Sequence, residues 1–495
     1  MRRAVCFSLF NNNNRVRRRP SSHSRPIREI CGAAVPAVGD QSIATAIRAA
    51  WSKKSSLGKH IVSAGTTPHD VYQPAVGSGT LVHMTPRRRP VRWTAANLLV
   101  TMSLAVSACD MAAVNNPYAG RAVPTPVTVS GSRQYARVSA GFFHSCAVTT
   151  GGEGWCWGSN EYLQLGTAGT PARCEAFTCS RTPLRVAGGL VLADIAAGVT
   201  FTCALTTAGR AYCWGGGYPG ARSLLGDSTI ASSPTPVRVL TDSTFTQITV
   251  GGAHSCALTA GGTALCWGEN QFGQLGNDSL SQSATPVVVS RTLRFASISA
   301  SSSTTCAVAV SGVGYCWGSN RWGQIGVGEV PYNSFGLAER RPREISGNLR
   351  WVQIAAGFDH TCGVTTAGAA LCWGRNENAG QLGDGTSISH RGVPTAVAGG
   401  GIYDGIDAGA VATCAHTPGN ELFCWGSNYF GGLGNGQAQV GGVNRPVRNI
   451  GGSFRGGEAA RNHSAGLGSS HGCAIKLDGS VSCWGDAFYG QTGDR

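Results

Sequence analysis

From residue 123 onward the chain consists of short apolar runs separated by clusters of Gly, Pro, Asn and Ser. Residues 256–266, Cys-Ala-Leu-Thr-Ala-Gly-Gly-Thr-Ala-Leu-Cys, are typical, because two apolar segments flank a turn. This pattern predicts a tight antiparallel hairpin. Gly262 stands where such a turn closes with a left-handed residue, a conformation that glycine adopts without strain.

The same hairpin pattern occurs seven times, each time between two cysteines ten residues apart. Every second cysteine is followed by Trp-Gly, from Trp157-Gly158 to Trp484-Gly485. Internal repetition of this kind predicts a fold built from equivalent units. The cysteine pairs are Cys146 with Cys156, Cys203 with Cys213, Cys256 with Cys266, Cys306 with Cys316, Cys362 with Cys372, Cys414 with Cys424, and Cys473 with Cys483. The turn residues are Gly152, Gly209, Gly262, Gly312, Gly368, Asn420 and Gly479.

The spacing places the two cysteines of each pair opposite each other on neighbouring strands. Directly opposed residues have Cα atoms about 4.5–5.5 Å apart, which is within disulfide range. We therefore expect seven disulfides, one per unit, and an eighth between Cys174 and Cys179. Zinc is the alternative, but a ten-residue spacing without a nearby second pair does not fit the usual ligand patterns. Cys6, Cys31 and Cys109 remain outside these pairs.

Each hairpin is followed by a second recurring segment. In the third unit it reads Trp-Gly-Glu-Asn-Gln-Phe-Gly-Gln-Leu-Gly over residues 267–276, and residues 317–326 and 380–386 are similar. This resembles the repeat of the regulator of chromosome condensation family, whose units form seven-bladed propellers. The resemblance covers residues 123–495 and implies an all-β, seven-bladed β-propeller. The second unit keeps only Leu225-Gly226, and the seventh has Asp486-Ala487 in place of a polar residue and Asn.

A further apolar strand should follow a proline in each unit, as at Pro236-Val237-Arg238-Val239, but the seventh unit ends before it. A spare strand, Thr125–Val129, precedes the first hairpin. We expect this N-terminal strand to complete the last blade, since closure leaves no unpaired edge between the ends of the ring.

The net charge of +15 is concentrated before the repeats. Residues 1–108 hold 16 Lys or Arg and 3 Asp or Glu, whereas residues 109–495 hold 24 and 22. A nearly neutral body offers little counterion release on binding phosphates. We therefore expect no nucleic-acid partner.

Residues 84–108 have the parts of a signal peptide: a basic start, a short apolar run over residues 98–106, and small residues at the end. Residues 104–109 resemble the lipobox of bacterial lipoproteins, which implies that Cys109 carries a lipid. The alternative is an ordinary cleaved signal. Residues 1–83 then form a doubtful extension preceding the true start at Met84, and residues 109–122 form a tether. The paired cysteines, which are not general among eukaryotic members of the family, suit an exported protein.

Little in the repeats suggests catalysis. His144, His254, His360 and His471 precede hairpin cysteines by two residues, but Phe201, Thr304 and Ala412 occupy the equivalent positions elsewhere and cannot bind metal. We expect these histidines to be structural, with bonds to backbone between blades. The tryptophans of Trp-Gly could suggest light sensing, but packing between blades is the simpler interpretation. We expect no cofactor, no metal and no enzymatic activity.

Three irregular loops are the better functional candidates, because loops on rigid scaffolds carry recognition. They span residues 167–182, 327–341 and 451–470. Exposed aromatic residues and arginines commonly anchor interfaces. The candidate anchors are Phe177, Tyr332, Phe335, Arg340, Arg341, Phe454 and Arg455.

The sequence thus favours a monomeric binding module for a protein or glycan at the cell envelope. Two alternatives stay open: a regulator that exchanges nucleotide on a GTPase, and an inhibitor of an extracellular enzyme. Fold resemblance does not choose between them.

Overall fold

The computed structural model describes residues 122–169, 173–174, 177–216, 224–331, 337–377, 379–438, 441–456 and 465–493. The expected extension, signal peptide and Cys109 lie outside the described residues. Within the described part of the chain, no helix is long and apolar enough to cross a bilayer.

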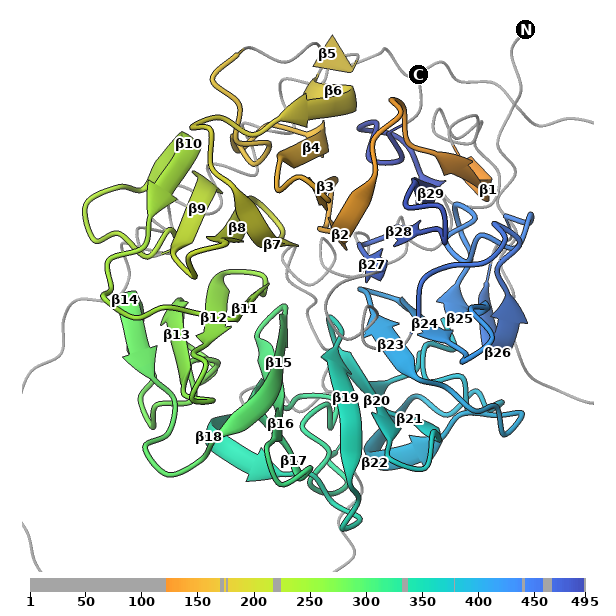
Figure 1. The fold of residues 1–495 in the computed structure, drawn as a ribbon. Helices are drawn as coiled ribbons and strands as arrows, with labels where there is room; N and C mark the ends of the chain where they lie inside the picture. Colours follow the sequence, from red (N-terminus) through yellow and green to blue (C-terminus); the bar gives the residue numbers. More distant parts are fainter. Residues whose placement is uncertain are drawn as a thin grey trace, which may run out of the picture. The chain divides into compact units, whose positions relative to one another are not determined.

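Seven sheets surround a common axis as the blades of a propeller (Figure 1). Each blade has four antiparallel strands, here called A to D from the axis outward, and blade 1 has a fifth. Blade 1 contains β2 (Tyr135–Ala140), β3 (His144–Thr149), β4 (Gly154–Ser159), β6 (Phe177–Arg185) and the additional β5 (Arg173–Cys174). Blade 2 contains β7 (Leu192–Ala197), β8 (Phe201–Thr206), β9 (Ala211–Gly216) and β10 (Ser232–Arg238). Blade 3 contains β11 (Gln247–Val250), β12 (His254–Leu258), β13 (Ala264–Gly268) and β14 (Ser283–Val288).

The remaining blades follow the same order around the ring. Blade 4 contains β15 (Phe295–Ser301), β16 (Thr304–Ala309), β17 (Gly314–Ser319) and β18 (Ala338–Glu344). Blade 5 contains β19 (Trp351–Ala356), β20 (His360–Thr365), β21 (Ala370–Arg375) and β22 (His390–Ala396). Blade 6 contains β23 (Gly405–Ala408), β24 (Ala412–His416), β25 (Leu422–Ser427) and β26 (Gly442–Arg448). Blade 7 contains β27 (Ala465–Leu467), β28 (His471–Ile475), β29 (Val481–Asp486) and, as strand D, β1 (Ala122–Thr128).

The predicted hairpin and its disulfide are confirmed in every blade. Each cysteine pair is in direct register across strands B and C, with Cα atoms 4.0–4.1 Å apart. The turn residue has a positive φ in all seven blades, from 63° at Asn420 to 83° at Gly479. The eighth disulfide joins Cys174 of β5 to Cys179 of β6 in blade 1. From blade 1 to blade 7, the hairpin disulfides join Cys146 to Cys156, Cys203 to Cys213, Cys256 to Cys266, Cys306 to Cys316, Cys362 to Cys372, Cys414 to Cys424, and Cys473 to Cys483.

The N-terminal strand closes the ring as predicted. β1 pairs antiparallel with β29, and Val127 lies opposite Cys483. The strand begins at Ala122, inside the expected tether, and ends one residue before the predicted Val129. The last blade is therefore built from both ends of the propeller sequence.

The Trp-Gly tryptophans lie between blades. All seven are fully buried, and the indole N–H of each donates to a backbone carbonyl of the preceding blade. Trp157 in blade 1, for example, donates to the carbonyl of Gln491 in blade 7 at 2.9 Å. Each tryptophan also belongs to an apolar cluster shared with that blade, so the core is divided into seven inter-blade layers.

The four histidines are buried between blades, and the partner of each Nε2 is a side-chain hydroxyl of the next blade, where a backbone group was expected. His254 Nε2 lies 2.8 Å from Thr305 Oγ1, and this hydroxyl donates in turn to the carbonyl of Gln274. His144, His360 and His471 make the equivalent contacts with Thr202, Thr413 and Ser145. Burial lowers the pKa of all four imidazoles, to about 4 for His254 and about 3 for the others.

Candidate functional site

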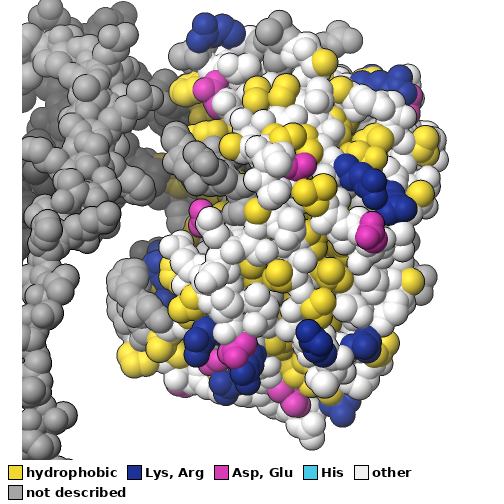
Figure 2. Space-filling model, turned by 90° about the vertical axis from the view of Figure 1, so that its left-hand side faces the viewer, with side chains coloured by type: hydrophobic (Ala, Val, Ile, Leu, Met, Phe, Trp, Pro, Cys, Tyr) yellow, Lys and Arg dark blue, Asp and Glu magenta, His cyan; other side chains and the backbone are white. Residues whose placement is uncertain are grey.

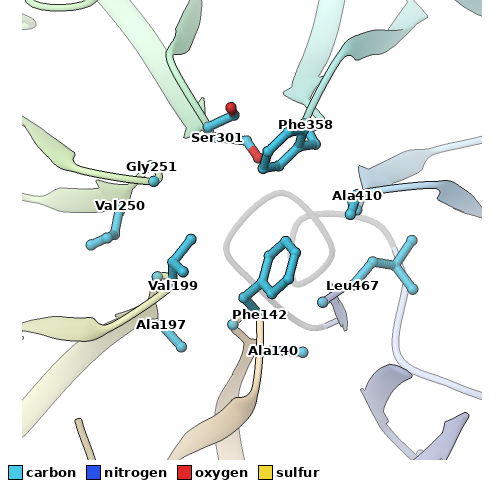
Figure 3. A pocket seen from close by; sticks show the side chains of 16 residues that line it. Ala140, Phe142, Ala197, Val199, Val250, Gly251, Ser301, Phe358, Ala410 and Leu467 are labelled. Atoms are coloured by element: carbon cyan, nitrogen blue, oxygen red, sulfur yellow. The ribbon is translucent and has the colours of Figure 1, made fainter. Parts of the chain in front are cut away.

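The A–B turns and C–D loops emerge together at one end of the ring, which we call the A–B end. Here the central channel of the propeller narrows to a cavity of about 60 Å³. Small and apolar residues from all seven blades line it. The Phe142 and Phe358 side chains point into its mouth from opposite sides (Figure 3). Their ring centroids lie 6.0 Å apart. These two side chains obstruct the axis and present an apolar surface at its centre.

A continuous series of aromatic rings runs from this mouth across the seam between blades 1 and 7. Phe142 packs against Phe143 with centroids 4.7 Å apart, and Phe143 lies 5.4 Å from Tyr489. Tyr489 lies 5.3 Å from Phe177, which also contacts Phe488 at 5.5 Å. Every member is at least partly exposed. We call this set the aromatic row: Phe358, Phe142, Phe143, Tyr489, Phe177 and Phe488.

Three local structures position the row. Phe142 and Phe143 occupy the short turn between β2 and β3, immediately before buried His144. Tyr489 follows β29, and its N–H donates to the Gln491 side chain at 2.8 Å, which fixes the loop. Phe177 begins β6 beside the Cys174–Cys179 disulfide. The row therefore stands on constrained backbone, which lowers the entropy lost when a partner binds.

A charged group adjoins the row at blade 5. Arg375 makes ion pairs with Asp359 at 3.2 Å and with Glu377 at 3.0 Å. The guanidinium also lies over the buried ring of Trp322, 5.0 Å from its centroid. Burial raises the pKa of Asp359 although two arginines act against it. The arrangement holds Arg375 against Asp359, the residue that follows Phe358, as a fixed polar edge of the apolar mouth.

The A–B end is acidic as well as aromatic. Within the described residues, its turns and loops, counted between the flanking strands and including the strand-end residues, hold three Arg or Lys and nine Asp or Glu. Arginines at the start of the outer strands offset part of this charge, since Arg341 pairs with Asp278 and Arg391 with Asp384. A partner with apolar and cationic groups would complement this end.

The predicted anchor residues of the three loops that the structure describes do not lie together. Phe177 belongs to the aromatic row. Arg340 and Arg341 lie in β18 on the rim, where Arg341 pairs with Asp278. Arg455 donates to the Tyr135 carbonyl at 3.4 Å. Tyr332 and Phe335 lie outside the described residues.

The prediction for Phe454 as an exposed anchor is wrong, because its side chain is 0% exposed and packs 6.0 Å from Trp484. Its N–H donates to Asn420, just as the Phe245 N–H donates to Gly209 in blade 2. Phe454 thus takes the core position that an aromatic residue fills at the start of other blades. Alignment of the repeats around the turn residue would have shown this.

Sequence reasoning missed five members of the row: Phe142, Phe143, Phe358, Phe488 and Tyr489. In the sequence these positions differ from one repeat to the next, although the motif that flanks them stays the same. The residues between Gly and His-x-Cys are Phe142-Phe143 in blade 1 but Gly252-Ala253 in blade 3. Core positions repeat in every unit, whereas these vary and carry exposed aromatic residues. Among the described residues, no group of three or more His, Cys, Asp or Glu side chains could hold a metal ion.

Comparison with known proteins identifies the repeats. A family model described as the RCC1-like domain matches residues 109–466, and one for the regulator of chromosome condensation (RCC1) repeat matches residues 463–491. The chain is 29% identical over 372 residues to the Ultraviolet-B receptor UVR8 of Arabidopsis thaliana, covering 73% of this chain and 79% of that receptor. It is 28% identical over 290 residues to the human E3 ubiquitin-protein ligase HERC2, covering 56% of this chain but only 6% of the ligase.

Two solved structures share the fold. Human WBSCR16 superimposes with a TM-score of 0.61 at 18% identity, covering 73% of this chain and 90% of that one. Prp20p of Saccharomyces cerevisiae superimposes with a TM-score of 0.56 at 20% identity, covering 76% and 95%. These comparisons support a propeller that acts as a regulator or binding module. The chain belongs to the family of RCC1-like propellers.

Proposed function

We propose that this propeller is an exported, lipid-anchored module that binds a protein or glycan of the cell envelope through the aromatic row. The observation that carries the proposal is the row itself: six partly exposed aromatic side chains in continuous contact on constrained backbone. Partly exposed aromatic clusters of this kind are the usual centres of binding interfaces.

The disulfides support the proposed location. Sixteen of the 19 cysteines form eight disulfides, and such a number is typical of proteins that fold in an oxidising compartment. The proposed signal peptide at residues 84–108 would deliver the chain there, and acylation of Cys109 would retain it at a membrane. We expect no nucleic-acid partner. On the side of the ring seen in Figure 2, Lys and Arg form separate groups and no continuous stripe.

A regulator of a GTPase is the alternative that the family suggests, since Prp20p of Saccharomyces cerevisiae binds Gsp1p and histones. To act on a cytosolic GTPase, the chain would have to stay in the cytosol. The eight disulfides argue against this alternative, because the cytosol keeps most thiols reduced. An inhibitor of an extracellular enzyme is a second alternative and could use the same aromatic row.

The binding proposal is tested with envelope extracts. The full chain is immobilised as wild type, as Phe143→Ser/Tyr489→Ser, and as the control Tyr162→Ser, an exposed aromatic residue outside the row. We expect a partner that the wild type and the control capture and the double variant loses. Equal capture by all three would refute the row as the site. Replacement of residues 332–336 by glycine and serine in parallel, which leaves β18 intact, shows whether that loop contributes.

The location is tested in cells. Fractionation of the wild type, with thiols blocked at lysis, should place the oxidised chain in the envelope. Metabolic labelling with a fatty-acid analogue should mark the wild type, and Cys109→Ser should abolish the label. A reduced, unlabelled chain in the cytosol would instead support the GTPase alternative.

A further inference from the structure

The opposite end of the ring, formed by the B–C turns and the loops that link one blade to the next, differs from the A–B end. We call it the B–C end. Its turns and linking loops meet directly: the Thr207 N–H donates to the Val191 carbonyl, and the Val310 N–H donates to the Arg294 carbonyl, each at 3.0 Å. Residues from both kinds of segment therefore form one surface.

Large aliphatic side chains stand out from this end. Six of them are between 49% and 71% exposed, whereas the exposed large apolar residues at the A–B end range from 37% to 48%. None of the six is aromatic. They are Val191, Leu240, Val310, Ile402, Ile450 and Leu477.

The six side chains are spread around the ring and do not form a cluster. Four lie in the loops that link blades 1–2, 2–3, 5–6 and 6–7, and two lie in the B–C turns of blades 4 and 7. A compact protein partner could cover only a few of them at once. A planar partner, in contrast, can contact all of them together.

The B–C end is also cationic. Counted between the flanking strands, strand-end residues included, its described turns and loops hold ten Arg or Lys and six Asp or Glu. The same count at the A–B end gives three and nine. The Arg294 carbonyl accepts from the Val310 N–H, and Arg350 precedes Trp351, whose N–H donates to Gly312 of the same B–C turn, so both exposed arginines belong to the surface that carries Val310.

We propose that the B–C end docks on an anionic lipid bilayer, with the six aliphatic side chains in the headgroup region and the surrounding arginines against lipid phosphates. The charge of the surface complements anionic lipids, and its spread of aliphatic side chains matches a plane. Peripheral proteins bind membranes through two contributions: shallow insertion of apolar side chains and attraction of basic side chains to anionic lipids. Docking in this orientation turns the aromatic row away from the membrane.

The proposal does not depend on acylation of Cys109, and it is compatible with it. Strand β1 begins at the A–B end, because Ala122 lies opposite Asp486. The 13 residues from Cys109 to Arg121 can reach about 45 Å at full extension. A blade strand of six residues spans about 20 Å. A lipid on Cys109 could therefore share a membrane with the B–C end.

The test uses the full chain with vesicles of phosphatidylcholine and phosphatidylglycerol that contain a lipid with a photoreactive headgroup. After illumination, labelled peptides are mapped by mass spectrometry, which separates contacts of the propeller from those of basic residues 1–108. We expect label in peptides containing Val191, Val310, Ile402 and Leu477. Omission of phosphatidylglycerol should remove most of it.

Two variants complete the test. Val310→Ser/Ile402→Ser/Leu477→Ser should lose most labelling of the B–C end, while the control Leu280→Ser/Ile388→Ser, exposed at the A–B end, should keep it. Because all five positions are exposed, thermal melting should confirm that both variants stay folded. Label confined to residues 1–108, equal label at both ends, or unchanged label in the triple variant would overturn the proposal. A further result would also overturn it: labelling of the wild type that is removed by adding an acidic protein as competitor but is unaffected by added salt.

Discussion

His144 in blade 1 donates its Nε2 proton to the Thr202 hydroxyl of blade 2, with the two atoms 2.8 Å apart. The direction follows from the next contact, since the Thr202 hydroxyl uses its own proton to bond the Gln164 carbonyl at 2.9 Å. Only the neutral Nε2–H tautomer satisfies both bonds and leaves Nδ1 without a charge. The histidine series therefore needs neutral imidazoles to join neighbouring blades.

We predict that acid destabilises the propeller between pH 6.5 and 4. The pKa of His254 and His416 is lowered by burial to about 4, against an ordinary value of 6.5. In this range the unfolded chain binds protons that the folded chain does not, so stability falls as pH falls. Each such histidine costs up to about 2 kcal/mol at pH 5. Thermal melting at pH 7 and pH 5 measures the loss.

The variant His254→Gln isolates one of these residues. Glutamine can still donate to Thr305 but does not titrate, so we expect it to reduce the loss of melting temperature between pH 7 and pH 5. Replacement of His390, whose ring is partly exposed at the A–B end, serves as the control. An unchanged pH profile for His254→Gln would contradict the assignment.

Asp407 should act in the opposite direction. Residues at its position in other blades cap an N–H of the next blade, as Ser139 does for Ala197 and Thr249 for Ala300. Among the described residues, Asp407 Oδ2 has no such partner, and burial raises the pKa of Asp407 to about 8 from 3.8. Folding then binds a proton, so stability is lost as pH rises from 4 to 8.

Asp407→Asn should therefore stabilise the protein at pH 8.5 by about 1–3 kcal/mol. The gain should shrink towards pH 4, where the carboxyl is protonated in both states. Chemical denaturation at the two pH values checks this. A gain of equal size at both values would mean that packing, not charge, is responsible.

Ring closure predicts a long-range effect of a short deletion. Removal of residues 123–130 takes away most of β1 and the buried side chain of Val129, and it exposes the edge of β29. We expect a loss of about 3–5 kcal/mol from lost apolar burial and unpaired backbone. Hydrogen exchange should show the loss first in β28 and β29. Deletion of residues 111–118 is the control and should leave melting unchanged.

The blade disulfides should resist reduction in the native state. Both sulfurs of Cys256–Cys266 belong to fully buried residues. Thiol titration of the native protein should therefore count only cysteines outside the eight pairs, even after mild dithiothreitol. The double variant Cys256→Ser/Cys266→Ser should lose about 2–3 kcal/mol. Rapid native labelling of the blade cysteines would contradict this.

Most of the fold could be predicted because its determinants are local. The distance from Cys256 to Cys266 and the turn at Gly262 specify a hairpin without reference to the rest of the chain. The aromatic row is different, because Phe143 and Tyr489 are separated by most of the propeller and meet only where the ring closes. The hydroxyl partner of His144 was missed for the same reason, since Thr202 belongs to the next repeat.

The confinement of each blade disulfide to one hairpin has a consequence for biogenesis. If the chain is exported as proposed, the cysteine nearest in sequence to every hairpin cysteine is its native partner ten residues away. Oxidation could then proceed hairpin by hairpin, since short loops close more readily than long ones. Only the final step, the return of β1 to β29, has to wait for the whole propeller to emerge.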